Sequence, residues 1–279
     1  KEIKPNTGVP ILMENQIFNE SCLDTMSRME DNSIDLIVTS PPYDNLRAYD
    51  SGVDQTWGES VWKPIISELC RVIKEGGAIV WVVGDATING SETGTSFKQA
   101  LYFKECGLNL HDTMIWEKAN PIPQIYRKRY TNLFEYMFVF SKGTLTTHNP
   151  IRIPCENAGL SLKGTTYKNF SKSEQIRSKK ASPVKEDKLK GNIWKFVVGK
   201  KKEDQESKGH TAPFPCDLAH DHIISWSNEG DIVYDPFLGS GTTAKMAKTT
   251  HRKYIGSEIN EDYFKIAQKR LSQTQEYLF

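Results

Sequence analysis

Four consecutive residues, Ser40-Pro41-Pro42-Tyr43, follow a short β-branched run at residues 34–39. Because proline cannot donate to a strand ladder, the two prolines predict that a buried strand ends there in a rigid turn. In such a turn the Ser40 hydroxyl and the Pro41 carbonyl can both accept hydrogen bonds from one bound donor. A plain strand terminator packed beneath an aromatic ring would have the same residues, so the turn alone leaves both interpretations open.

The donor that suits these two acceptors is an exocyclic amine on cytosine or adenine. Such an amine is a poor nucleophile because its lone pair is delocalised into the ring, and hydrogen bonds from both of its protons favour an attacking, tetrahedral geometry. Tyr43 offers a flat face for a base withdrawn from a duplex, and stacking of this kind contributes about 1 to 3 kcal/mol. If the turn binds a base in this way, direct methyl transfer to the base amine becomes possible.

A second turn, at residues 235–243, follows a predicted strand and opens a predicted helix. Its glycines let backbone amides approach a ligand at the helix N-terminus. It lacks the lysine of a phosphate-binding Walker loop and does not match the three-glycine dinucleotide pattern. About twenty residues further on, Glu258 ends a strand and is placed to accept both hydroxyls of a ribose. Together these features predict an adenosine-type cofactor. The residues expected to bind it here are Asp235, Pro236, Phe237, Gly239, Gly241, Thr242, Thr243 and Glu258.

The elements that must position these turns alternate along the chain. Apolar periodicity and turn signals predict strands at residues 34–39, 78–83, 113–116, 133–140, 231–234 and 254–257. They predict helices at residues 61–74, 96–106, 217–226, 241–248 and 261–271. This alternation favours an α/β fold with a mostly parallel sheet covered by helices on both faces.

Charge is distributed unevenly although the net charge is only +1. Residues 144–208 carry 15 Lys/Arg and 7 Asp/Glu, against 21 and 28 in the rest of the chain. A basic segment set into an acidic body is either a solvated linker or a module that contacts phosphates. On the second interpretation the expected phosphate contacts are Lys179, Lys180, Lys200, Lys201 and Lys202.

The five cysteines are scattered and lack the paired spacing of a zinc site, so neither a metal nor a disulfide framework is predicted. No stretch reaches the roughly 18 apolar residues of a membrane-spanning helix, and the N-terminus lacks the layout of a signal peptide. We therefore expect a cytoplasmic protein with no membrane partner.

Taken together and in this order, the two turns resemble those of the β-group DNA amino-methyltransferases of restriction-modification systems. In that family a Ser/Asp-Pro-Pro-Tyr motif comes first, a target-recognition region follows, and a Phe-x-Gly-x-Gly motif lies near the C-terminus. The resemblance implies a Rossmann-like S-adenosylmethionine-dependent methyltransferase fold with a circularly permuted motif order. It divides the chain into a first catalytic part (1–143), an inserted target-recognition region (144–208) and a second catalytic part (209–279).

The same resemblance implies further residues and partners. Residues 210–215 are similar to the family's cofactor-binding segment, which places Phe214 near the methionine part of S-adenosylmethionine, with Pro215 beside it. The loop at residues 44–49 is expected to close over the flipped nucleotide, with Arg47 contacting DNA. The family also implies a bacterial, archaeal or phage origin, double-stranded DNA as substrate, and a cognate restriction endonuclease and a homodimer as partners.

The target base remains open at this point, whereas the residues disfavour three rival functions. Relatives with Ser before Pro-Pro mostly act on cytosine N4, while adenine N6 enzymes mostly carry Asp or Asn, so cytosine N4 leads and adenine N6 is the alternative. A C5-cytosine mechanism needs a thiolate after proline, for which Cys155 and Cys216 are the candidates. Protein-glutamine methyltransferases also use a Pro-Pro-Tyr turn but place the glycine motif first. A silent DNA-binding subunit is expected to have lost Tyr43 or the glycines.

Overall fold

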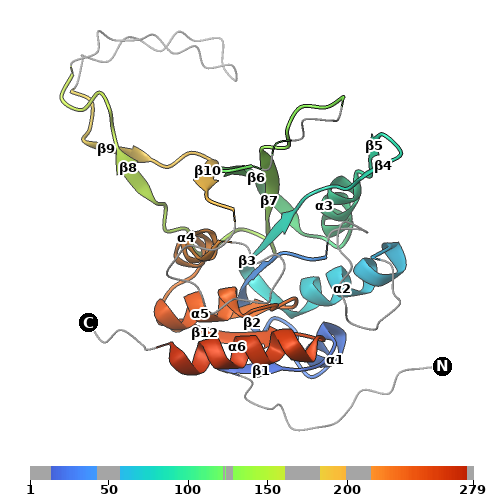
Figure 1. Ribbon diagram of the computed structural model, residues 1–279. Coiled ribbons are helices and arrows are strands. Elements are labelled where there is room, and N and C mark those ends of the chain that lie inside the picture. Colours follow the sequence, from blue (N-terminus) through green and yellow to red (C-terminus); the bar gives the residue numbers. More distant parts are fainter. Residues whose placement is uncertain are drawn as a thin grey trace. The chain divides into compact units, whose positions relative to one another are not determined.

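Residues 14–42, 57–121, 123, 128–160, 183–198 and 215–274 are described by the structure, a computed structural model of the chain. In these ranges the main element is an eight-stranded sheet in which parallel pairing dominates (Figure 1). β7 pairs antiparallel with both β3 and β6, and the other neighbouring strands are parallel. In sheet order the strands are β1 (Gln16–Phe18), β12 (Lys253–Ser257), β11 (Ile232–Asp235), β2 (Ile34–Thr39), β3 (Ile73–Val83), β7 (Phe134–Ser141), β6 (Asn109–Lys118) and β10 (Ile193–Phe196).

The helices of the described part form two groups. α1 contacts α2 and α2 contacts α3, whereas α5 contacts both α4 and α6 (Figure 1). Their bounds are α1 (Cys22–Met26), α2 (Glu59–Val72), α3 (Thr95–Glu105), α4 (Cys216–Trp226), α5 (Thr242–Thr249) and α6 (Glu261–Gln273). None of the helices in the described ranges is long and apolar enough to cross a membrane.

Both faces of the central strands are buried. Ile79 and Trp81 on β3 pack with α2 and α3 in one hydrophobic cluster, and the alternate residues Val80 and Val82 are equally inaccessible to solvent. Because successive strand residues point to opposite faces, burial of all four means that the sheet is covered on both sides. This agrees with the α/β class predicted from the alternation of elements.

The chain divides into two compact units. One comprises residues 1–149 and 192–279 and holds the eight-stranded sheet, and the other comprises residues 150–191. In the second unit β8 (Arg152–Pro154) pairs antiparallel with β9 (Asp187–Leu189), and an Arg152–Asp187 ion pair of 2.7 Å joins the two strands. The bounds of the target-recognition region, residues 144 and 208, stay a prediction. β10 lies within these bounds but belongs to the large sheet.

All six predicted strands and all five predicted helices are present, with ends that differ by a few residues. The sequence patterns did not give α1, the small hairpin of β4 (Thr87–Ile88) and β5 (Ser91–Glu92), or the short strands β1, β8, β9 and β10. These elements are too short to show a repeating apolar pattern: α1 has five residues and begins where the Ser21 side chain accepts from the Leu23 amide.

The aromatic core between α3 and the sheet gives a direct stability prediction. Phe103 is fully buried, stacked on Phe140 with ring centroids 4.3 Å apart and edge-on to Trp81 at 5.2 Å. Phe103→Ala should lower the free energy of unfolding by about 3 to 5 kcal/mol in urea denaturation. Phe97→Ala, on the same helix but 49% exposed, is the matched control and should cost far less. Equal losses would contradict this assignment of the core.

Candidate active site

The two turns singled out in the sequence lie beside each other, at the carboxyl ends of adjacent parallel strands. β2 leads to the Ser40-Pro41-Pro42 turn and β11 leads to the glycine-rich turn, and these strands are neighbours in the sheet. From β2 the chain continues through α2 to β3 on one side, and from β11 through α5 to β12 on the other. The strand order therefore reverses between β2 and β11, which is where open α/β sheets bind their ligands.

The first turn is only partly accessible to solvent. Pro41 is buried, and Ser40 and Pro42 are half-buried. The other predicted residues of the acceptor side and of the DNA interface lie outside the described residues, as does one predicted cofactor residue. These are Tyr43, Arg47, Lys179, Lys180, Lys200, Lys201, Lys202 and Phe214.

Asp235 is the last residue of β11 and is almost completely buried. Its Oδ1 atom accepts a hydrogen bond of 2.6 Å from the Thr39 hydroxyl and one of 3.0 Å from the Phe237 amide. Burial raises the pKa of Asp235 from its usual 3.8 to about 6, and the hydrogen bonds from the Thr39 hydroxyl and the Phe237 amide oppose that rise. Hydrogen-bond donors thus hold the carboxylate in the interior.

The glycine-rich turn is tight where it meets the helices. Gly239 and Gly241 both have positive φ angles, +54° and +82°. A Cβ atom on Gly241 would lie 3.0 Å from the Cβ of Ala267 on α6, so a larger residue would push the turn away from that helix. Thr242 and Thr243, which open α5, are buried.

Glu258 follows β12 and connects the glycine turn to the next loop. Its Oε2 accepts from the Gly239 amide at 2.7 Å, and its Oε1 accepts from the Asn260 amide at 2.8 Å. Burial, together with the nearby charge of Asp235, raises the pKa of Glu258. The site therefore contains one buried and one half-buried carboxylate, both of which are stabilised by hydrogen-bond donors.

Arg270 was not anticipated from the sequence. This fully buried side chain on α6 donates to the Ser240 carbonyl, to the Ser240 hydroxyl at 3.0 Å and to the Thr242 hydroxyl at 3.3 Å. The available signal was its spacing, because it lies three residues after Ala267 and beside Leu271 on the apolar side of α6. A basic residue in that position needs buried acceptors, and the glycine turn supplies them.

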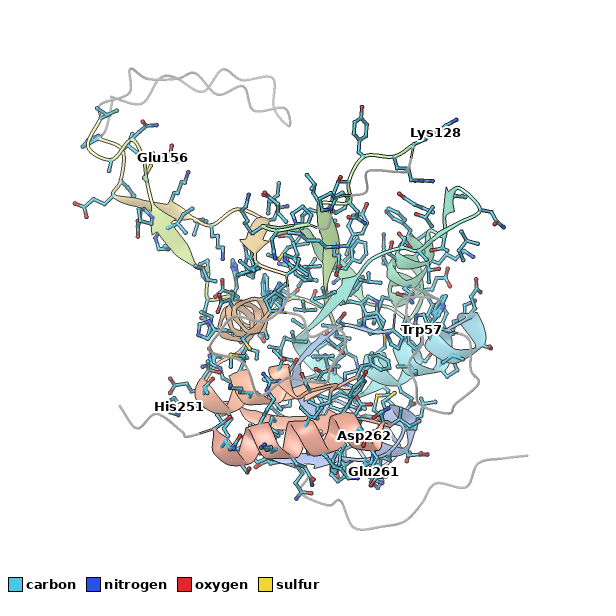
Figure 2. All side chains as sticks on the ribbon, in the orientation of Figure 1. Trp57, Lys128, Glu156, His251, Glu261 and Asp262 are labelled. Atoms are coloured by element: carbon cyan, nitrogen blue, oxygen red, sulfur yellow. The ribbon has the colours of Figure 1, made fainter. Side chains whose placement is uncertain are left out.

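Aromatic rings support the start of the glycine turn. Phe237 is half-buried and meets the edges of Trp57 and Trp81, with centroids 5.4 and 6.1 Å away. Trp57 lies just ahead of α2 (Figure 2) and Trp81 lies on β3, so two elements that follow the Ser-Pro-Pro turn in the chain contact the glycine turn. Pro236 between Asp235 and Phe237 is buried, and Pro215 caps the N-terminus of α4.

The structure thus brings Ser40, Pro41 and Pro42 together with the residues of the glycine turn and with Glu258, at one edge of the sheet. Among the described residues there is no group of three His, Cys, Asp or Glu side chains that could hold a metal ion. The chemistry available at this edge comes from two carboxylates, hydroxyls, backbone groups and whatever ligand binds beside them.

Comparison with known proteins gives a consistent result. A family model described as DNA methylase, named for N6 and N4 methyltransferases, matches residues 34–269. The chain is 51% identical over 246 residues to the orphan methyltransferase M.BamHII of Bacillus amyloliquefaciens, covering 86% of this chain and 89% of that protein.

Solved structures share the fold at lower sequence identity. The PvuII DNA methyltransferase, described as cytosine-N4-specific, superposes with a TM-score of 0.66 at 17% identity and covers 94% of both chains. The M1.HpyAVI complex with S-adenosylmethionine gives a TM-score of 0.60 at 21% identity and covers 92% of this chain and 98% of the other.

The raised pKa of Asp235 predicts a stability that depends on pH. The Asp235 carboxyl group binds its proton more tightly in the folded chain than in the unfolded chain. Its ionisation therefore lowers the free energy of unfolding above about pH 6, and this loss becomes smaller as the pH falls towards 4. Asp235→Asn keeps an oxygen that can accept from Thr39 and Phe237. It should raise the free energy of unfolding at pH 8 by up to roughly 3 kcal/mol in urea denaturation, and much less near pH 4.

Asp262→Asn, which changes an exposed carboxylate on α6 (Figure 2), is the control and should have little effect at either pH. An Asp235→Asn protein that is less stable than the parent at pH 8 would refute the buried, ionised carboxylate.

The close approach of Gly241 to α6 gives a second prediction. Gly241→Ala should lower both the melting temperature and the affinity for S-adenosylmethionine, because the left-handed backbone costs Ala about 1 to 2 kcal/mol and the new methyl group contacts Ala267. Gly230→Ala shares the left-handed φ, +85°, but its new Cβ meets no atom within 4 Å. This control should lose stability without losing affinity, and equal affinity losses would argue against a ligand at the glycine turn.

Proposed function

The chain belongs to the DNA methylase family of N6 and N4 methyltransferases, and from that premise we propose that it transfers a methyl group from S-adenosylmethionine to the exocyclic amine of a flipped DNA base, preferably cytosine N4. The observation that carries this proposal is the position of the two turns at adjacent strand ends. A group held by the Ser-Pro-Pro turn and a ligand held by the glycine turn would meet there. That is the arrangement that direct transfer between two bound molecules requires.

The residues of the glycine turn suit a cationic adenosine cofactor. Asp235 and Glu258 are shielded carboxylates surrounded by hydrogen-bond donors, so a positively charged ligand would lower the cost of keeping them ionised. Glu258 would hold the ribose hydroxyls, while Gly239, Gly241 and Thr242 would lie along the ligand. S-adenosylmethionine, when bound, supplies a methyl group on a positively charged sulfur, which leaves as a neutral thioether with the electron pair of the broken C–S bond.

On the acceptor side, the Ser40 hydroxyl and the Pro41 carbonyl would accept the two protons of the target amine. These hydrogen bonds orient the nitrogen lone pair towards the methyl group, and Tyr43 would stack on the extruded base. The new bond joins the amine nitrogen to the methyl carbon, and the nitrogen then releases one proton to solvent. The residues thus orient the acceptor amine, and no covalent bond forms between the protein and either reactant.

Serine at position 40 favours cytosine N4 over adenine N6. A cytosine amine flanked by a serine hydroxyl and a carbonyl has two neutral acceptors for its two protons, whereas the adenine enzymes of the family mostly carry Asp or Asn at this place. Adenine N6 methylation with the same site residues is the alternative. A C5-cytosine mechanism through Cys155 or Cys216 has little support, because the matching family model is named for N6 and N4 methyltransferases.

Contacts with DNA are proposed for two parts of the chain. Arg47 would follow the nucleotide as the loop at residues 44–49 closes over it. The basic segment at residues 144–208 would recognise the target sequence and contact phosphates through Lys179, Lys180, Lys200, Lys201 and Lys202. A homodimer and a cognate endonuclease remain predictions. The relative with 51% identity is named an orphan methyltransferase, which favours an enzyme that works without a paired endonuclease.

Product analysis tests the proposed reaction. Purified protein incubated with plasmid DNA and S-adenosylmethionine should yield N4-methylcytosine when the DNA is digested to nucleosides and analysed by mass spectrometry. Tyr43→Ala should reduce the yield by at least tenfold because the base loses its stacking partner. N6-methyladenine would establish the alternative target, and unmodified DNA from a protein that binds S-adenosylmethionine would refute the DNA reaction.

Salt dependence tests the role of the basic segment. The logarithm of the DNA association constant should fall linearly with the logarithm of the salt concentration. Replacing Lys200, Lys201 and Lys202 by Ala should make this slope less steep by about 0.9 for each lost phosphate contact. Lys265→Ala is the control, because Lys265 pairs with Glu261 at 2.7 Å on α6. An unchanged slope in the triple variant would support the solvated-linker interpretation.

A further inference from the structure

One buried hydrogen bond joins the two halves of the site. The Thr39 hydroxyl, at the end of β2, donates to Asp235 Oδ1, at the end of β11, over 2.6 Å. Both side chains are shielded from water, Thr39 completely and Asp235 to within 1%. Thr39 directly precedes Ser40-Pro41-Pro42, and Asp235 directly precedes the glycine turn. The bond therefore connects the turn that would hold the base to the turn that would hold the cofactor.

The strand ladder cannot make this connection by itself. In the described ranges, the paired positions between β11 and β2 are Val233 with Leu36 and Tyr234 with Ile37. The ladder between β2 and β3, by contrast, continues to Thr39 opposite Trp81. On the cofactor side of β2, backbone pairing thus ends before the last two residues, and side chains must fix the spacing of the turns.

Two further hydrogen bonds strengthen the same junction. The Thr243 hydroxyl, in the first turn of α5, donates to the Val38 carbonyl over 3.2 Å. The Phe237 amide donates to the same Asp235 oxygen that Thr39 reaches. Asp235 Oδ1 therefore holds one donor from each turn, and a shift of either turn would break one of these bonds.

We propose that Thr39 is a positioning residue, whose hydroxyl sets the distance between the base amine and the methyl donor. The inference rests on the proposed function, because it concerns the same site. Transfer between two bound groups needs the reacting atoms about 3 to 3.5 Å apart, and a misplacement of about 1 Å can cost roughly 100-fold in rate. Thr39 contacts neither reactant directly in this proposal; it acts through Asp235 on one side and through Ser40 on the other.

Substitutions at position 39 separate this role from packing. Thr39→Val keeps the size and the branched shape but removes the donor, whereas Thr39→Ser keeps the donor and removes a methyl group. If the hydroxyl sets the spacing, Thr39→Val should lower kcat by about 10- to 100-fold, with S-adenosylmethionine and DNA dissociation constants within about threefold of the parent. Thr39→Ser should recover kcat to within about threefold.

Ser225→Ala is the matched control for loss of a buried hydroxyl. Ser225 is 3% exposed and donates 2.6 Å to the Asp221 carbonyl within α4, away from the two turns. It should lower the melting temperature to a similar extent while leaving kcat unchanged. Thr39→Ala removes the same donor as Thr39→Val without the added methyl group, and it serves if the valine variant does not fold.

The measurements are kcat in single turnover, both dissociation constants by calorimetry, and the melting temperature. A folded Thr39→Val or Thr39→Ala protein with the parent kcat would overturn the proposal. So would a Thr39→Ser protein as slow as Thr39→Val, since the methyl group and not the hydroxyl would then matter. Failure of the parent protein to methylate any DNA would instead refute the proposed function, so the two failures can be told apart.

Discussion

A carboxylate buried at the junction of two parallel strands needs hydrogen-bond donors around it, and at Asp235 those donors come from both halves of the site. Thr39 reaches it from the strand that leads to Ser40-Pro41-Pro42, and Phe237 reaches it from within the glycine turn. Thr39 and Asp235 are 196 positions apart in the chain, yet their strands are neighbours in the sheet. Without this contact the two turns would depend on the short ladder between β11 and β2, the Thr243–Val38 hydrogen bond and the Trp57–Phe237 ring contact.

The electrostatics of the same edge favour ligand binding over stability. Burial raises the pKa of both Asp235 and Glu258, and the nearby charge of Asp235 raises the pKa of Glu258 further. The ionised Asp235 carboxylate lowers the stability of the free protein above about pH 6. A cationic ligand would stabilise the ionised carboxylates and so offset this loss of stability. The same attraction would contribute to the affinity for the ligand. Arg270 stabilises the glycine turn, because its buried guanidinium donates hydrogen bonds to Ser240 and Thr242.

The fold was predictable because its elements are long and strongly patterned. The six strands and five helices were recognisable from apolar periodicity, and the glycine turn from its place between strand and helix. Sequence patterns could not give the contacts that join distant segments. Thr39 appears in the chain only as the polar end of an apolar run, and Arg270 only as one basic residue of a charged helix. Their roles depend on the order of β11 and β2 in the sheet, which is a tertiary property.

The most direct test of this account is a crystal structure of the protein with a non-reactive analogue of S-adenosylmethionine and a DNA duplex that contains the target site. The account predicts the ribose hydroxyls at the Glu258 carboxylate, and the amine of an extruded base within hydrogen-bonding distance of the Ser40 hydroxyl and the Pro41 carbonyl. The Thr39–Asp235 hydrogen bond should remain intact between the two ligands. A cofactor bound away from the glycine turn, or a base amine that contacts neither Ser40 nor Pro41, would contradict it.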